Sequence, residues 1–192
     1  MTTARTVYTL SIALLLGALA ACGRNPFAVT WTANPDTVLL YSIDRPELNL
    51  PSAFDFYPAH RYTVAVEAAG ATGNWDLALG TEGDSLVFLT PEALGANVSA
   101  AVTTFPGMSL DELTEAPSDS AAYSYEEPVP VRVGTAYVVR TRVNVSRYGA
   151  RCAYYAKLYP LEVNPDVGTV RFVYDVNPAC NDRSLVPDNP AP

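Results

Sequence analysis

Residues 152–180, CAYYAKLYPLEVNPDVGTVRFVYDVNPAC, have the pattern of a β-hairpin. The turn signal Asn-Pro-Asp-Val-Gly at 164–168 separates two runs rich in β-branched and aromatic residues, 153–163 and 169–176. Pro160 interrupts the first run, which predicts a bulge or an edge position there. In the second run, apolar side chains at alternate positions share one face of the strand: Val170, Phe172, Tyr174 and Val176.

The two cysteines at the ends of this segment indicate a disulfide. Cys152 and Cys180 are equally distant in sequence from residue 166, so a hairpin centred on the turn would place them opposite each other. A bridge would close the open end of the hairpin and stabilise the fold by about 3–4 kcal/mol in the chain-entropy model. Two free buried thiols are the alternative. A zinc site is not expected, because two cysteines and the distant His60 do not complete a closed zinc ligand set.

The rest of the chain shows the same short apolar runs, separated by Pro, Gly, Asn and Asp. They predict further strands at 30–33, 37–43, 62–68, 75–79, 85–90, 98–105, 129–133 and 135–143. Helical signals are short: residues 109–112 (SLDE) resemble a capping box, and 91–96 fits a single turn. We therefore predict an all-β domain, an antiparallel β-sandwich or sheet with one or two short helical turns.

The first 21 residues have the features of an export signal. Arg5 precedes an uncharged run of 14 residues, 8–21, which is shorter than the ~20 residues of a membrane-spanning helix. The run leads into LAACG at 19–23, which resembles a bacterial lipobox. The resemblance implies cleavage before Cys22, a lipid on its thiol and acylation of the new amino terminus. An ordinary cleavable signal with a chance cysteine is the alternative.

These assignments divide the chain into a signal peptide (1–21), a tether (22–29), one β-rich domain (30–184) and a Pro-rich, extended tail (185–192). Lipidation of Cys22 would leave the other two cysteines as an even pair in an oxidising compartment. Two or more acyl chains hold a protein stably at a membrane, so we expect a lipid-anchored domain in the cell envelope. Gly23, in place of the Asp that often retains such proteins at the inner membrane, favours the outer membrane, on its periplasmic or surface side.

Composition limits the function. Of the 192 residues, 49% are hydrophobic and 17% charged, which excludes a disordered chain and allows a substantial core. The net charge of −8 argues against nucleic acid as the partner. No Lys or Arg lies between Arg61 and Arg132, while acidic residues continue through this stretch. A solvated face is the usual meaning of such a run, and an acidic binding patch is the alternative.

Catalytic signatures are missing from the sequence, which has no G-x-S-x-G elbow, Walker loop, G-x-G-x-x-G, EF-hand or zincin pattern. His60, the single histidine, precedes a predicted strand, where a surface or hydrogen-bonded role is expected. Glycosidase chemistry needs two carboxyl groups facing each other across a cleft, and the candidates are Asp55, Glu67 and Asp76. We predict a non-enzymatic protein with no metal and no resident cofactor.

Aromatic residues are a further source of binding sites. A side chain with an apolar body and a polar tip suits sugars or flat rings, although packing on a sheet face is the alternative. The residues considered for a ligand site are His60, Trp75, Met108, Tyr137, Tyr154 and Tyr155.

Several short motifs, taken in order, resemble the HmuY-like family of bacterial lipoproteins. They are FDF at 54–56, WDLAL at 75–79, AP at 116–117, YVVRT at 137–141, YAKL at 155–158 and VRFVY at 170–174. The resemblance covers about two thirds of the mature chain and implies a β-rich, surface-anchored domain. The best-known family members bind haem between two axial side chains.

This chain departs from the haem-binding pattern because it has one histidine and therefore no bis-histidine pair. His60 with Met108, or Met108 with a tyrosine, would be the remaining axial combinations. The leading expectation is a membrane-tethered lipoprotein that binds a small ligand or an envelope partner, with haem a minor candidate. The alternative is a structural or assembly lipoprotein of the outer membrane that has no small-molecule site.

Overall fold

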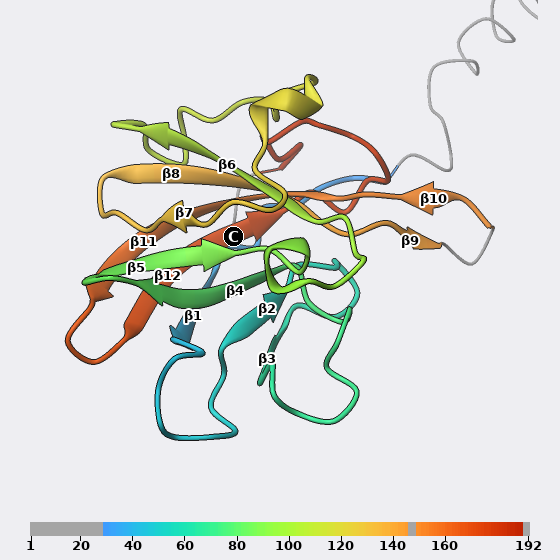
Figure 1. The fold of residues 1–192 in the computed structure, drawn as a ribbon. Helices are drawn as coiled ribbons and strands as arrows, with labels where there is room; N and C mark the ends of the chain where they lie inside the picture. Colours follow the sequence, from blue (N-terminus) through green and yellow to red (C-terminus); the bar gives the residue numbers. More distant parts are fainter. Residues whose placement is uncertain (1–28, 146–148, 190–192) are drawn as a thin grey trace, which may run out of the picture.

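The structure is a computed structural model, and it describes residues 29–145 and 149–189. The predicted signal peptide, the lipidation site Cys22 and the tether up to residue 28 lie outside the described residues, as do residues 190–192. The fold is all-β, as predicted, with two five-stranded antiparallel sheets facing each other (Figure 1). Among the described residues, no helix is long and apolar enough to cross a membrane.

The first sheet has the strand order β1-β12-β11-β8-β6 and contains the predicted hairpin. Its strands are β1 (Asp36–Tyr41), β6 (Ala101–Pro106), β8 (Thr135–Arg140), β11 (Tyr155–Asn164) and β12 (Thr169–Val176). Ala156 pairs with Val176 and Pro160 with Phe172, after which the register shifts by one residue. The bulge predicted near Pro160 is therefore confirmed, and the pairing before it places Cys152 opposite Cys180.

The second sheet has the order β3-β2-β4-β5-β7, and a separate two-stranded sheet projects beside it (Figure 1). The strands of the second sheet are β2 (Ala53–Asp55), β3 (Tyr62–Val64), β4 (Leu77–Glu82), β5 (Ser85–Leu89) and β7 (Val129–Pro130). The small sheet pairs β9 (Asn144–Val145) with β10 (Arg151–Cys152). The second sheet contains no Lys or Arg, because most of it falls in the stretch between Arg61 and Arg132.

The main core lies between the two sheets and is rich in aromatic rings. Phe54 and Phe56 of the second sheet meet Phe172 and Tyr174 of the first, with ring centroids 4.8–6.4 Å apart. The alternation predicted for β12 is confirmed, since Val170, Phe172, Tyr174 and Val176 are all buried. Such interlocking apolar faces are what hold two sheets together.

Helical structure is limited to two 3-10 turns among the described residues, η2 (Glu92–Leu94) and η3 (Ser120–Ala122). η2 confirms the turn predicted at 91–96. At 109–112 the structure forms a turn rather than a helix, although the Glu112 carboxylate accepts hydrogen bonds from the backbone N–H and hydroxyl of Ser109. The local capping pattern is present, but no helical run follows it.

Several sequence-based strand bounds need correction. The strands predicted at 75–79 and 98–105 begin at Leu77 and Ala101, and those predicted at 129–133 and 135–143 end at Pro130 and Arg140. Residues 30–33 form only one bridge, between Thr32 and Asn189, and the strand predicted at 62–68 ends at Val64. Strands β2, β9 and β10 were not among the strands predicted from apolar runs. They have only two or three residues each, which is too short to show a period-two pattern. The last described residues pack on the domain: Leu185 is fully buried, and the Ala33 N–H donates to the Asn189 carbonyl at 3.0 Å.

Candidate functional site

A buried ion cluster joins the two sheets at one end of the sandwich. Arg142, just after β8, donates from both terminal nitrogens to the two carboxylate oxygens of Asp55, at 2.9 and 3.0 Å. The same guanidinium donates to Asp76 at 3.0 Å, and the Arg142 backbone N–H donates to that Asp76 oxygen at 2.8 Å. We call Asp55, Asp76 and Arg142 the Arg142 cluster. Both aspartates come from the FDF and WDLAL motifs.

The cluster carries two carboxylates against one guanidinium, and its electrostatics follow from its burial. Asp55 and Asp76 have no exposed surface. Burial raises the pKa of Asp76 to about 6, while the charge of Arg142 and hydrogen bonds from the Arg142 and Phe56 backbone N–H groups act in the opposite direction. For Arg142, burial disfavours the charged form, but the bonds and charges of both aspartates outweigh it and raise its pKa.

His60 connects the cluster to the surface. Its Nδ1 lies 3.4 Å from Asp55 Oδ2, and about half of its side chain is exposed. The His60 ring also contacts Tyr57 and Tyr62, with centroids 5.0 and 5.7 Å away. A carboxylate behind Nδ1 favours a proton on that nitrogen and leaves Nε2 for solvent or a ligand.

A cleft of about 580 Å³ opens beside His60 and the Arg142 cluster. It lies between the β3 end of the second sheet, the loops around residues 73–74 and 97–99, and the small β9–β10 sheet. Its lining residues are His60, Tyr62, Gly73, Asn74, Asn97, Val98, Ser99, Arg142, Val143, Asn144, Val145 and Arg151. We call it the His60 cleft. No Asp or Glu is among these residues.

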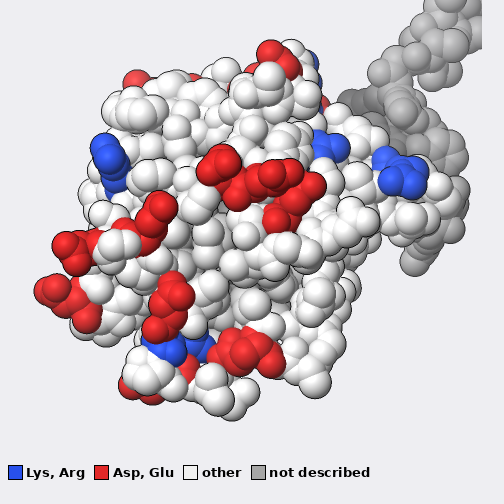
Figure 2. Space-filling model, in the orientation of Figure 1, with Lys and Arg blue, Asp and Glu red and all other residues white. Residues whose placement is uncertain are grey.

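The lack of acidic side chains in the His60 cleft contrasts with the rest of this face. Figure 2 shows acidic side chains spread over much of this face, including the β4–β5 side, and fewer basic ones, some of which lie near the projecting β9–β10 ribbon. The Arg142 cluster keeps its carboxylates behind the cleft, where the guanidinium balances one of their two charges. The lining of the cleft itself carries Arg142 and Arg151 and no Asp or Glu, on a protein of net charge −8.

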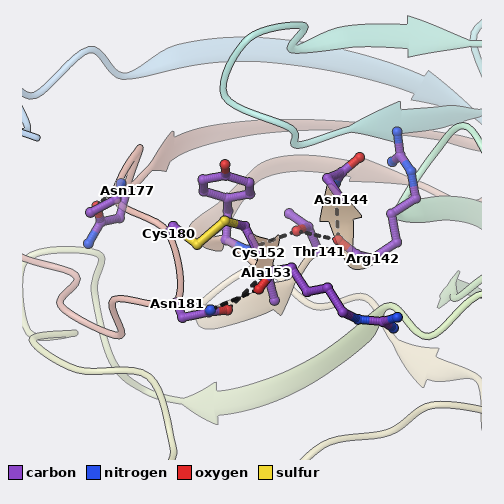
Figure 3. Close-up of a disulfide and its surroundings, with 11 residues drawn as sticks. Thr141, Arg142, Asn144, Cys152, Ala153, Asn177, Cys180 and Asn181 are labelled. Carbon is purple, nitrogen blue, oxygen red and sulfur yellow. Dashed lines mark hydrogen bonds between the residues drawn. A yellow bond between two sulfur atoms is a disulfide. The ribbon is translucent and has the colours of Figure 1, made fainter. Parts of the chain in front are cut away.

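The predicted disulfide supports one wall of this cleft. Cys152 and Cys180 are bridged, with their Cα atoms 5.0 Å apart, and Figure 3 shows the bridge beside the Asn181 contacts. The Asn181 amide accepts from the Ala153 N–H at 2.9 Å and donates to the Arg151 carbonyl at 3.0 Å. The bridge and the amide together fix β10, which carries Arg151 into the cleft.

Of the six residues considered for ligand binding, the structure places only His60 in this cleft. Trp75 is buried on the far side of the second sheet from the main core, against Ala53 and Leu89. Tyr137 is fully buried, and its hydroxyl donates to the Pro130 carbonyl and accepts from the Arg132 N–H. Tyr154 packs in the main core, and burial raises the pKa of its phenol.

The remaining two candidates lie on the other side of the first sheet. Tyr155 and Met108 belong to a second apolar cluster with Leu113, Tyr123 and Leu185. Tyr155 also lines a smaller cleft of about 260 Å³, together with Tyr123 and Arg140. His60 and Met108 share no cleft, so the structure does not bring this pair together, whereas Met108 lies in one apolar cluster with Tyr155 and Tyr123. The described residues also contain no group of three or more His, Cys, Asp or Glu side chains able to hold a metal ion.

The carboxylates considered for glycosidase chemistry do not face each other across a cleft. Asp55 and Asp76 are buried on one guanidinium, as described above. Glu67 accepts from Arg45 Nη2 at 3.0 Å and from the Asn49 N–H at 2.8 Å. Arg45 lines another cleft, of about 640 Å³, but its guanidinium is held by Glu67 and by backbone carbonyls.

Sequence reasoning did not identify the Arg142 cluster as a unit or the polar lining of the His60 cleft. Asp55 and Arg142 are 87 residues apart, and Asp76 and Arg142 are 66 apart. The sequence did contain one signal for the cluster, because Arg142 is a charged residue within the predicted apolar strand 135–143. Searches against known protein families and against curated proteins found no match to this chain.

Proposed function

We propose that this protein is a lipid-anchored, non-enzymatic lipoprotein of the cell envelope that binds a small ligand in the His60 cleft. The lipobox-like sequence at Cys22 supports the anchor, and the order of motifs supports a relationship to HmuY-like lipoproteins. The observation that carries ligand binding is the His60 cleft itself, an acid-free, polar site supported by a disulfide on a chain of net charge −8. Sites of this volume suit small molecules.

The cleft favours a polar ligand over haem. Its lining is dominated by amides, hydroxyls and charged groups, whereas a porphyrin needs a large apolar slot and axial ligands. We therefore propose an outer-membrane lipoprotein that captures a small polar compound, without a resident cofactor.

Anchoring is tested by feeding cells an alkyne fatty acid and detecting its attachment to the protein. We expect labelling of the wild-type chain and loss of label in Cys22→Ser. Cys180→Ser is the matched control, because it removes a cysteine that we assign to the disulfide and should keep the label. Equal labelling of wild type and Cys22→Ser would contradict the proposed anchor.

Ligand binding is tested by thermal-shift screening of the mature chain, in mild detergent, against sugars, sugar acids, amino acids and organic acids. A compound that binds in the His60 cleft should raise the melting temperature of the wild type and of Arg171→Gln. It should have a smaller effect on Arg151→Gln. Arg171 lies on β12 and pairs with the exposed Glu162, so it is a surface control outside the cleft. A screen in which no compound distinguishes the two variants would overturn the proposed site.

The second candidate is an assembly role, and the charge of the second sheet favours it. The strands of that sheet contain no Lys or Arg, and Glu82 and Asp84 are exposed at its β4–β5 turn, so a basic face of a neighbouring envelope protein would complement this end. In-cell crosslinking from a photoreactive residue at Ser85, the exposed start of β5, would then capture a defined partner, and the yield would fall when Glu82 is replaced by Gln and Asp84 by Asn.

A further inference from the structure

We infer that the His60 cleft recognises a sugar of monosaccharide size that carries a carboxylate. This inference rests on the proposed function and names the ligand class of that site. It is drawn from three properties of the cleft: the hydrogen-bonding groups that remain free, an exposed aromatic ring, and one cation without an acidic partner.

Several polar groups of the cleft have hydrogen-bonding capacity left for a ligand. The Asn74 amide donates to the Gly70 carbonyl at 2.7 Å and that of Asn144 to the Arg142 carbonyl at 3.1 Å, so in each the oxygen remains as an acceptor. Asn97 and Ser99 are exposed, and no side-chain bond involves either of them within the described part of the chain. Sugar hydroxyls both donate and accept, which matches a ring of amides and hydroxyls.

An aromatic side chain supplies the apolar contact that the C–H face of a sugar ring requires. Tyr62 is 45% exposed, more than any other tyrosine among the described residues, and the His60 ring packs 5.7 Å from it at a 45° tilt. Val98 and Val145 add apolar surface to the lining. The site therefore combines an aromatic platform with polar edges, a pairing suited to amphipathic rings.

The charge of the cleft selects for a monoanion. Arg142 is neutralised by Asp55 and Asp76 and is largely covered. Arg151 is exposed on β10, and no described acidic side chain lies within ion-pair distance of it. A guanidinium binds a carboxylate with two parallel hydrogen bonds. One unpaired guanidinium in a cleft without acidic groups fits one carboxylate.

The disulfide and Asn181 fix the backbone of β10 at Arg151 before any ligand arrives. The Arg151 carbonyl accepts from the Asn181 amide, and the next residue is bridged to Cys180. A wall fixed in this way loses less conformational entropy on binding.

The test is isothermal titration calorimetry of the mature chain in detergent with glucuronic acid, glucose and acetate. We expect glucuronic acid to bind, and glucose and acetate to bind at least tenfold more weakly. Arg151→Gln should weaken glucuronic acid by about ten- to a hundredfold, whereas Arg171→Gln should leave its affinity unchanged. Asn97→Ala is a second variant, on an exposed loop, and should also weaken the sugar acid.

The outcomes separate this inference from the proposed function. If glucose binds as tightly as glucuronic acid, the proposed role of the carboxylate is wrong, and the cleft is a site for neutral sugars as well. If acetate binds as tightly as glucuronic acid, the proposed role of the sugar ring is wrong. If none of the three probes binds while the thermal-shift screen finds another ligand that depends on Arg151, the ligand class is wrong and the proposed function stands. If neither experiment finds a ligand, both fall.

Discussion

Replacing Arg142 by Met is the sharpest perturbation that the structure offers. The substitution keeps an unbranched apolar stem that reaches about as far as Nε of arginine but removes the guanidinium shared by Asp55 and Asp76. Both carboxylates are without exposed surface, so water cannot take over the role of the lost cation. The variant is therefore left with two uncompensated acidic groups inside the protein.

The expected cost follows from that burial. Removing one partner from a buried ion pair typically costs about 3–5 kcal/mol, and here one guanidinium serves two carboxylates. A domain of this size unfolds with a free energy of about 5–15 kcal/mol, so the loss is a large share of the total. The matched control is Arg171→Met, which breaks an exposed pair with Glu162 at 3.4 Å and should cost at most about 1 kcal/mol.

The deficit of Arg142→Met should depend on pH in a defined direction. The pKa of Asp76 in the folded protein is about 6, above the ordinary value of about 3.9. A carboxyl whose folded pKa is raised binds more protons in the folded state, so its contribution to stability is largest at low pH and is lost as the pH rises through 6. Without the guanidinium this loss is greater, and the deficit should be larger at pH 7.5 than at pH 5.

The assay is urea unfolding of the mature chain in mild detergent, followed by tryptophan fluorescence, because Trp31 and Trp75 are both buried. Wild type, Arg142→Met and Arg171→Met are compared at pH 7.5 and pH 5. The reasoning is refuted if Arg142→Met unfolds within about 1 kcal/mol of the wild type at pH 7.5. It is also refuted if the deficit is the same at both pH values.

Three further predictions concern the same unfolding assay. Reduction of the Cys152–Cys180 bridge should lower the free energy of unfolding by about 3–4 kcal/mol and weaken any ligand held by β10; an unchanged midpoint after complete reduction would contradict this. Tyr137→Phe should cost about 1–3 kcal/mol, because the hydroxyl bonds to two backbone groups in residues 130–132, and a neutral result would assign the hydroxyl no structural role. Leu185→Ala should cost about 2–5 kcal/mol, since the side chain is fully buried; a change below 0.5 kcal/mol would show that the carboxyl-terminal segment does not belong to the core.

The hairpin could be predicted from the sequence because its information is local. The turn residues lie between two strands long enough to show a pattern, and the equal spacing of Cys152 and Cys180 from the turn also gives the register. The same reasoning failed for β2, because its three residues are too few to show the alternation of apolar and polar side chains. It also misplaced 30–33, where Thr32 forms a single β-bridge with Asn189 of the carboxyl-terminal segment.

The site could be predicted only in part, for a physical reason. Local pattern predicts strands that contain Tyr137 and Trp75, which is correct for Tyr137 in β8 but wrong for Trp75, which precedes β4. Which face of a strand meets the core depends on the partner sheet. Both aromatics are buried, and the exposed ring belongs to Tyr62. The Arg142 cluster depends on contacts across 66 and 87 residues, which no local pattern encodes.

A buried ion cluster contributes little net stability compared with well-packed apolar side chains, so stability alone does not account for the Arg142 cluster. Its geometry offers a better account. Arg142 lies between β8 and β9, and its bonds to Asp55 and Asp76 tie the start of the β9 arm to the second sheet, while the disulfide ties the β10 arm to Cys180. The β9 and β10 walls of the His60 cleft are thus fixed separately, β9 by the Arg142 cluster and β10 by the disulfide. The cluster also keeps two carboxylates buried behind the cleft, with one of their charges balanced by Arg142, so that the exposed Arg151 is the charged group that β10 presents to an anion.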